Sequence, residues 1–551
     1  MTPAADQWWR SAVIYQVYIR SFADGTGDGV GDIAGIRSRL PYLQELGVDA
    51  LWITPWYPSP MNDGGYDVAD YRDIAPEFGT LALADALIRE AHERRLRVLI
   101  DIVANHTSHR HRWFAQALAA LPGSPERDRY IFRPGRGPDG NEPPNNWLSL
   151  FGGPGWTRVT ERDGSLGEWY LHLFDVTQPD LNWQNSEVRA EFLDILRFWF
   201  DRGIDGFRID VAHGLAKDPA LPDLDYIRTS PYPIHAPYPR GNHPFDDRDE
   251  VHEIYREWRA VADSYVPPRA FVAEAWVDSA ERLARYVWPG QLHSAFNFDY
   301  LRSPWNASEL RKTIDVSLDV LNPAGAATTW VLSNHDVERH VTRYGREVTA
   351  IPSVRERPAA PGPSDIALGT RRARAAALLM LALPGSAYVY QGEELGLPEV
   401  LDLPESALRD PIWKRSGHRV RGRDGCRVPL PWTRRGPSHG FGVNGSWLPQ
   451  PPYWSDYAVQ GQREDPRSML SLYREALRLR RDLPALGDGS LRWLTDGGPD
   501  VLAFAREPEF ACAVNLGETF VALPEHSRVL LSSVPLVDNT LPPDAAAWLA
   551  T

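Results

Sequence analysis

Short runs of apolar residues, rich in Val, Ile and aromatic side chains, alternate along the chain with segments of helical periodicity. Ile33, Ile36, Leu40 and Leu43 mark one helical face, and Ser186 opens another helical pattern that closes at Gly203. Such alternation predicts parallel strands joined by helical crossovers, and eight strands predict an α/β fold of the (β/α)8 TIM barrel type. The eight runs are Val13–Ile19, Val48–Ile53, Val98–Val103, Gly206–Asp210, Phe271–Glu274, Ser294–Phe298, Trp330–Ser333 and Ala387–Gln391.

Four of the predicted crossovers are long and rich in Gly, Pro, Asn or Trp. Each follows a strand, where a barrel places its chemistry. The first is long enough to predict a small domain inserted after strand three. The four are His106–Asp180, Asp218–Arg248, Arg343–Asp365 and Leu397–Arg463.

The C-terminal part of the chain has a different pattern. After a helix carrying Leu470, Tyr473 and Leu477, short alternating strands begin near Gly487 and predict a C-terminal antiparallel β domain. We therefore expect the first part of the barrel at 1–105, an inserted domain B at 106–176, the rest of the barrel at 177–486 and the β domain at 487–551.

Composition and charge narrow the function. The 551 residues are 43% hydrophobic and 24% charged, which is ordinary for globular proteins, and the net charge of −14 disfavours nucleic acid or an anionic membrane as a partner. Cys426 and Cys512 cannot make a disulfide framework, and neither an apolar leader nor an apolar run of membrane-spanning length is visible, so we expect a cytoplasmic protein. The 21 Trp and 21 Tyr suit either stacking on sugar rings or a large aromatic core.

Carboxylates end several predicted strands. Asp210 ends GFRID, Glu274 lies in VAEAW and Asp336 ends NHD, so all three should converge in the mouth of the barrel. Glycoside cleavage needs one protonated and one ionised carboxyl group. We expect Arg208, two residues before Asp210, to keep Asp210 ionised, and crowded neighbours to keep Glu274 protonated.

In this order the motifs Asp101–His106 (DIVANH), GFRID, VAEAW and NHD resemble the α-amylase superfamily of glycoside hydrolases, from about Val13 to Glu394. The resemblance implies that Asp210 is the nucleophile, Glu274 the general acid/base and Asp336 the carboxylate that fixes the sugar hydroxyls. It also implies that His106 and His335 hydrogen-bond the ring of the glucose being transferred, in subsite −1.

Three further motifs resemble the α-glucosidase and oligo-1,6-glucosidase branch of that superfamily. They are Gly65–Tyr71 (GYDVADY), Gln178–Trp183 (QPDLNW) and Asp424–Trp432 (DGCRVPLPW). The resemblance implies that Asp67 binds the non-reducing glucose, that Arg427 lies beside it and closes the pocket, and that Gln178 belongs to the substrate site. Such a clamp forces attack at chain ends.

Aromatic residues near these motifs are candidates for the walls of the sugar site, and plain core packing is the alternative for each. They are Tyr66, Phe151, Phe174 and Trp276.

The loop DGTGDGVGD alternates oxygen-bearing residues with glycines, an arrangement that suits a structural Ca²⁺ or Mg²⁺. The resembled branch holds a cation here, although the alternative is a Gly-rich turn with solvated acids. A second calcium site, which the family's α-amylases have near Asn105, is not expected, because His213-Gly214 replaces their Lys-His. The candidate ligands are Asp24, Thr26, Asp28, Asp32 and the carbonyl of Val30.

The sequence thus predicts a retaining exo-α-glucosidase acting on short oligosaccharides or disaccharides, with an α-glucoside as its small-molecule partner, no organic cofactor, no nucleic acid and no membrane. An α-transglucosylase or glucoside isomerase of the same family is the alternative. A catalytically inactive binding subunit is disfavoured, since all three carboxylates are present. In the resembled branch, a Val directly after the nucleophile accompanies a preference for α-1,6 linkages, so the resemblance at Val211 leans toward α-1,6. The pattern does not indicate an oligomeric state.

Overall fold

The structure, a computed structural model, describes residues 5–224, 243–351, 362–494 and 498–551. Parts of the predicted insertions at 218–248 and 343–365 lie outside these residues. Every predicted site residue lies within them.

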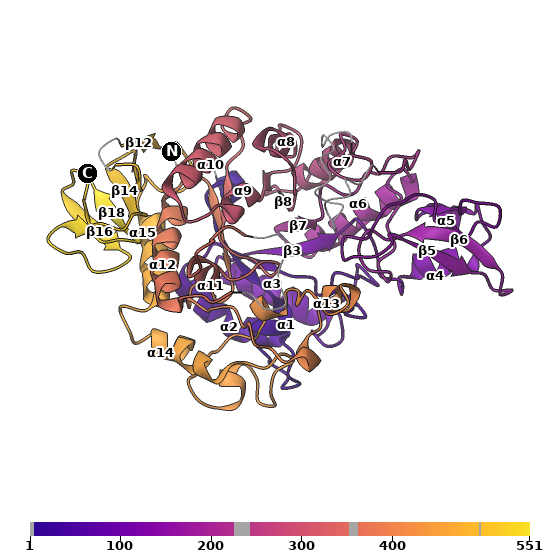
Figure 1. The fold of residues 1–551 in the computed structure, drawn as a ribbon, viewed down its shortest axis with the longest axis horizontal. Helices are drawn as coiled ribbons and strands as arrows, with labels where there is room; N and C mark the ends of the chain where they lie inside the picture. The colour runs from indigo at the N-terminus through magenta and orange to yellow at the C-terminus, as the bar shows by residue number, and fades with distance from the viewer. Residues whose placement is uncertain (1–4, 225–242, 352–361, 495–497) are drawn as a thin grey trace.

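The eight predicted strands are confirmed and form one parallel sheet (Figure 1). They are β1 Val13–Val17, β2 Ala50–Ile53, β3 Arg97–Val103, β7 Gly206–Asp210, β8 Ala270–Ala273, β9 Ser294–Ala295, β10 Thr329–Val331 and β11 Ser386–Tyr390. Their order is β10-β11-β1-β2-β3-β7-β8-β9, and a parallel bridge between Phe296 and Thr329 joins the two ends. The sheet is therefore a barrel.

Helices connect the strands and surround the barrel. The predicted stripe of α2 is fully buried, and this helix begins at Asp32, whose carboxylate accepts the Gly35 amide, and ends at Gly47 with a left-handed φ of 96°. The cap of α6 differs from expectation, because Asn185 rather than Ser186 accepts the first free amide. The helices are α1 Ile19–Phe22, α2 Ile33–Leu46, α3 Leu81–Glu93, α6 Ser186–Asp201, α7 Val251–Asp263, α8 Ala280–Arg285, α9 Phe298–Arg302, α10 Ala307–Leu321, α11 His340–Tyr344, α12 Ile366–Ala382, α13 Pro411–Arg415, α14 Val459–Gln462 and α15 Met469–Asp482.

A small domain follows β3, as the sequence predicts. It carries a three-stranded antiparallel sheet in the order β4-β6-β5, which projects at one end of the molecule (Figure 1). Its elements are α4 Arg112–Ala119, α5 Pro125–Asp128, β4 Phe132–Arg133, β5 Trp156–Thr160 and β6 Leu166–Leu171. They lie inside the range 106–176, whose boundaries stay a prediction.

The C-terminal antiparallel β domain lies at the opposite end of the molecule (Figure 1). Its main sheet has the order β12-β13-β14-β18-β16 and packs on α12, where the Trp548 indole donates to the Leu378 carbonyl at 3.0 Å. No helix in the described part of the chain is long and apolar enough to cross a membrane. The strands are β12 Arg492–Trp493, β13 Val501–Arg506, β14 Phe510–Asn515, β15 Val521–Ala522, β16 Arg528–Ser532, β17 Thr540–Leu541 and β18 Ala545–Ala550.

The strand register sets the position of the chemistry. Asp101 of β3 is paired with Arg208 of β7, and Val103 is paired with Asp210 two residues further on. Paired residues of neighbouring parallel strands face the same side, and both Asp101 and Arg208 are buried. Asp210 ends β7, and Glu274 directly follows β8, so the predicted carboxylates meet at the carboxyl end of the barrel.

Candidate active site

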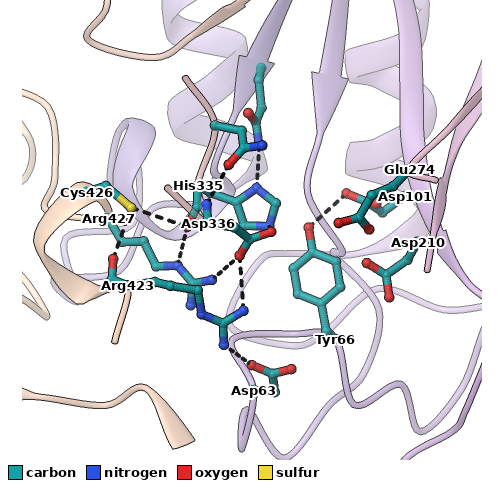
Figure 2. A network of polar contacts seen from close by, with 12 residues as sticks. Asp63, Tyr66, Asp101, Asp210, Glu274, His335, Asp336, Arg423, Cys426 and Arg427 are labelled. Atoms are coloured by element: carbon teal, nitrogen blue, oxygen red, sulfur yellow. Dashed lines mark hydrogen bonds and ion pairs between the residues drawn. The ribbon is translucent and has the colours of Figure 1, made fainter. Parts of the chain in front are cut away.

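One buried guanidinium connects three carboxylates at the carboxyl ends of β3, β7 and β8. Nη1 of Arg208 lies 2.6 Å from Asp101 and 2.6 Å from Asp210, while Nη2 lies 2.6 Å from Glu274. Figure 2 shows the three carboxylates grouped on one side of the site. Because the same guanidinium holds both, Asp210 and Glu274 lie close together, as a retaining carboxylate pair requires.

Two carboxyl groups of this cluster, Asp101 and Asp210, have raised pKa values. Burial raises the pKa of Asp101 to about 6, even though Arg208 opposes the shift. Burial, followed by the charges of Glu274 and Asp101, raises the pKa of Asp210 well above its ordinary value. Arg208 favours the ionised form of Asp210, as predicted, while burial and two neighbouring carboxylates act against it, so the ionised state of Asp210 stays a prediction.

Glu274 is held at both carboxylate oxygens. The Val211 amide donates to Oε2 at 3.0 Å, and the Trp276 indole donates to Oε1 at 3.1 Å. Val211 has a φ of +47°, a left-handed conformation that is unusual for a β-branched residue and places strain beside the site. Trp276, a predicted aromatic wall, stacks on Phe298 with 3.8 Å between ring centroids. These contacts fix the direction of the Glu274 carboxyl group.

A second cluster surrounds Asp336 (Figure 2). Its Oδ1 lies 2.8 Å from Arg427 and 3.0 Å from Arg423, and its Oδ2 lies 3.4 Å from His335. Burial alone would raise the pKa of Asp336, but His335 and the two arginines outweigh it and hold the pKa well below its ordinary value. Asp336 is thus an ionised carboxylate in the mouth of the barrel.

The buried clamp consists of Asp63 and Arg423, at 2.7 Å, rather than of the predicted Asp67 and Arg427. Asp67 and Arg427, both described, do not contact each other. The carboxylate of Asp67 turns back into its own loop, where it accepts hydrogen bonds from Ser59 Oγ and from the amides of Asn62 and Asp63. The prediction placed the clamp four residues too late on each side.

Asp63, Arg423 and Asp410 are therefore site residues that the sequence analysis missed. Arg423 contacts Asp336 and Asp63 through its terminal nitrogens and Asp410 through Nε at 2.6 Å. Position gives a usable signal for two of them, because Arg423 directly precedes the DGCRVPLPW motif and Asp63 stands two residues before GYDVADY. Asp410 lies in a long insertion and carries no such signal.

Tyr66 lies between the two clusters (Figure 2). Its ring stacks on His335 with 5.3 Å between centroids and 7° between planes, and its hydroxyl donates to Asp101 at 3.2 Å. Burial lowers the pKa of His106 to about 4, so this histidine is neutral, and its Nε2 contacts the Tyr66 carbonyl at 3.0 Å. The side-chain amide of Gln178 donates to Asp63 at 3.2 Å. Each of these predicted residues borders the same space.

Phe151 and Phe174, on the small domain, form an aromatic pair with 5.5 Å between ring centroids. The Phe174 ring lies 5.0 Å from His106, and the guanidinium of Arg423 lies 5.4 Å from the centroid of Phe151. Both rings are half-buried. The pair therefore lies between His106, which Phe174 contacts, and Arg423, which Phe151 contacts.

Lys217 is a further residue that the sequence analysis missed. Its ammonium lies 2.6 Å from Asn105 Oδ1 and 2.8 Å from Asp180 Oδ2, and burial lowers its pKa. A fixed cation of the protein thus stands beside Asn105, where no calcium ion was expected.

The loop at 24–32 has carboxylate oxygens of the kind that a hard cation binds, but these oxygens accept hydrogen bonds from backbone amides. Asp24 accepts from Gly27 and Gly29, Asp32 accepts from three amides, and Asp28 accepts from Val30. Among residues 5–224, 243–351, 362–494 and 498–551, no group of three or more His, Cys, Asp or Glu side chains could hold a metal ion. The residues as placed do not form a cage, so the cation stays a prediction.

Known proteins are similar to this chain over nearly its whole length. Residues 16–489 match the α-amylase catalytic domain. A probable α-glucosidase of Rhizobium meliloti is 39% identical over 91% of this chain and 87% of its own length, and an oligo-1,6-glucosidase of Parageobacillus thermoglucosidasius is 34% identical over 91% and 88%. The crystal structure of the α-glucosyl transfer enzyme XgtA superimposes with a TM-score of 0.84 at 36% identity, covering 98% of this chain and 99% of that one.

Proposed function

Because the chain belongs to the α-amylase family and is a glycoside hydrolase, we propose that it is a retaining exo-α-glucosidase that removes single glucose units from short α-glucosides. The observation that carries this proposal is the buried Asp63–Arg423–Asp336 chain of ion pairs. It lies beside the three-carboxylate cluster, and a clamp at this place would close the site beyond the terminal glucose and so favour attack at a chain end. Charge-assisted hydrogen bonds of this kind also fit the hydroxyls of a terminal glucose.

The proposed reaction has two steps. Asp210 attacks the anomeric carbon while Glu274 gives its proton to the leaving oxygen, which forms a glucosyl-enzyme. Glu274 then takes a proton from water, and the water oxygen displaces Asp210. The ionised Asp336, fixed by Arg423 and Arg427, stabilises the positive charge that develops on the sugar ring.

Two isosteric variants test these roles. We expect Asp210→Asn and Glu274→Gln each to lower turnover of a nitrophenyl α-glucoside by several orders of magnitude, since acid–base assistance alone is worth about 10²–10⁴-fold. Thermal unfolding should stay close to that of the wild type, because neither change alters side-chain volume. Retention of more than about a tenth of wild-type turnover by either variant would refute the assignment.

Transfer of glucose to a second sugar is the second candidate, favoured by the similarity to an α-glucosyl transfer enzyme. It uses the same glucosyl-enzyme, with a sugar hydroxyl in place of water. Incubation with maltose or sucrose alone distinguishes the two: a glucosidase gives mainly free glucose, whereas a transglucosylase or isomerase gives trisaccharides or isomeric disaccharides.

Three further properties belong to the proposal. The lean toward α-1,6 bonds rests on Val211, and rates on maltose and isomaltose test it. The proposal of a cation rests on the oxygen-bearing residues at 24–32, and melting temperatures with Ca²⁺ and with a chelator test it. A cytoplasmic location rests on Cys426 and Cys512, which are buried free thiols suited to a reducing compartment, and cell fractionation tests it.

A further inference from the structure

Arg415, the last residue of α13, reaches from the long segment after β11 to the small domain. Its Nε and Nη2 donate to the Gly152 carbonyl at 3.0 and 2.6 Å, and its Nη1 lies 3.3 Å from Asp175 Oδ1. Gly152 has a φ of +102°, a left-handed conformation that glycine adopts without strain. Arg415 thus makes a directed bridge between two segments that are more than 200 residues apart in sequence.

Both residues that Arg415 contacts are next to an aromatic residue of the site. Gly152 follows Phe151, and Asp175 follows Phe174. The Ser149 hydroxyl joins the two segments, because it donates to the Phe174 carbonyl at 2.6 Å and accepts the Phe151 amide at 3.1 Å. Arg415 therefore holds the aromatic pair as one unit.

The contacts continue from this unit to the clamp. The Phe151 ring lies against Arg423, and the Asp175 amide donates at 2.9 Å to Gln178, whose own amide donates to Asp63. Two separate routes therefore lead from Arg415 to the Asp63–Arg423 pair. Neither route places Arg415 in contact with Asp210, Glu274 or Asp336.

Charge and burial favour a persistent bridge. The side chains of Arg415 and Asp175 are 18% and 14% exposed. Burial would raise the pKa of Asp175, but hydrogen bonds from Thr177 and the charge of Arg415 outweigh it and lower the pKa, so the carboxylate is ionised near neutral pH. A shielded ion pair that also satisfies a carbonyl contributes more than an exposed surface pair.

We propose that Arg415 is a positioning residue: it holds Phe151 and Phe174 against Arg423 and so sets the fit of the pocket around the terminal glucose. The inference rests on the proposed function, because it assumes that this pocket binds glucose. It acts on binding rather than on the chemical step, since the bridge reaches the clamp and not the nucleophile or the acid.

Kinetics of matched variants test this inference. For Arg415→Ala we expect KM for a nitrophenyl α-glucoside and Ki for glucose each to rise about tenfold, with kcat within about threefold of wild type, as loss of uniform binding predicts. Arg415→Lys keeps the charge but not the fork, so it should restore part of the loss. Arg419→Ala is the control, because Arg419 is exposed in the same segment and contacts only the nearby Ser416 carbonyl among its described side-chain partners; it should behave as wild type.

A double-mutant cycle with Asp175→Asn shows whether the two residues act through one bridge. We expect the effects of Arg415→Ala and Asp175→Asn on KM to be clearly less than additive. Unchanged KM and Ki in Arg415→Ala would overturn the inference, and so would a fall in kcat equal to the rise in KM. A wild-type enzyme that releases no glucose would instead refute the proposed function, so the two failures are distinguishable.

Discussion

Asp63 and Asp67 stand four residues apart on one loop, yet their carboxylates have different partners. Asp63 meets the guanidinium of Arg423, whereas Asp67 is fully buried against Ser59 and two backbone amides. A motif identifies the loop, but the direction of each side chain depends on turns that the motif does not describe. At the scale of the residue, which of the two carboxylates pairs with Arg423 is therefore a structural finding.

This difference predicts opposite outcomes for two alanine variants. Asp63→Ala should lower kcat/KM by at least about tenfold, because it removes a carboxylate that we propose binds the terminal glucose. Arg423 keeps Asp336 and Asp410 as partners, so the melting temperature should change less than in Asp67→Ala. Asp67→Ala should lower the free energy of unfolding by about 1–3 kcal/mol, because two buried amides lose their acceptor. Steady-state kinetics and thermal melts of both proteins measure this. The reverse pattern would restore Asp67 as the sugar ligand.

At the scale of the element, periodicity predicts the barrel well because each strand is short, buried and β-branched or aromatic. All eight predicted strands exist, and so does the stripe of α2. The strand Ala545–Ala550 escapes prediction, because four of its six residues are alanine, which has low strand propensity and takes its place here through pairing with β14 and β16. The positions of Asp210 and Glu274 are equally predictable, since strand ends fix them.

The clamp, Lys217 and Arg415 escape prediction for a different reason. Their partners come from segments far apart in the chain, such as Asp63 and Arg423 or Gly152 and Arg415. No local pattern encodes which arginine of a long insertion reaches which loop. Only the packing of these distant segments against one another decides it.

The loop at 24–32, which leads into α2, carries the prediction about the cation. If it binds Ca²⁺, excess Ca²⁺ should raise the melting temperature by a few degrees over a chelated sample, since a ligand that binds the folded state stabilises it. Asp28→Asn should abolish this difference without altering the cap of α2, because Asp28 accepts only the Val30 amide whereas Asp32 holds the cap. Equal melting temperatures with Ca²⁺ and with chelator would identify a hydrogen-bonded turn without an ion.

At the scale of the whole molecule, buried histidines determine how stability depends on pH. Burial lowers their pKa values to about 4, or to about 3 for His340, so the folded protein keeps them neutral while the unfolded chain takes up protons below its histidine pKa of about 6.5. Acid therefore favours unfolding. The residues are His106, His111, His172, His252, His293 and His340.

Several buried carboxyl groups act in the opposite direction, because burial raises their pKa. Burial raises the pKa of Asp67 and of Asp101 to about 6, so their protonated forms stabilise the fold as pH falls through the same window, and a pKa of about 8 for Glu393 lowers stability as pH rises through neutrality. Because each of the six histidines acts over the whole range from about pH 6.5 to pH 4, whereas Asp67 and Asp101 act only below about pH 6, we expect the melting temperature to be highest near neutrality and to fall over this range. Differential scanning calorimetry across this range measures it, and a melting temperature that rises on acidification would contradict the assignment.

The central claim is that Asp210 and Glu274 cleave α-glucosides from the chain end with retention. Proton NMR of the first minutes of hydrolysis of maltotriose and isomaltotriose tests it most directly, because the newly formed reducing end keeps its configuration until it mutarotates. We predict that α-glucose appears first, together with a disaccharide that retains the equilibrium anomer ratio of the starting sugar. Initial β-glucose, or a disaccharide that carries the fresh α-anomer, would contradict the account.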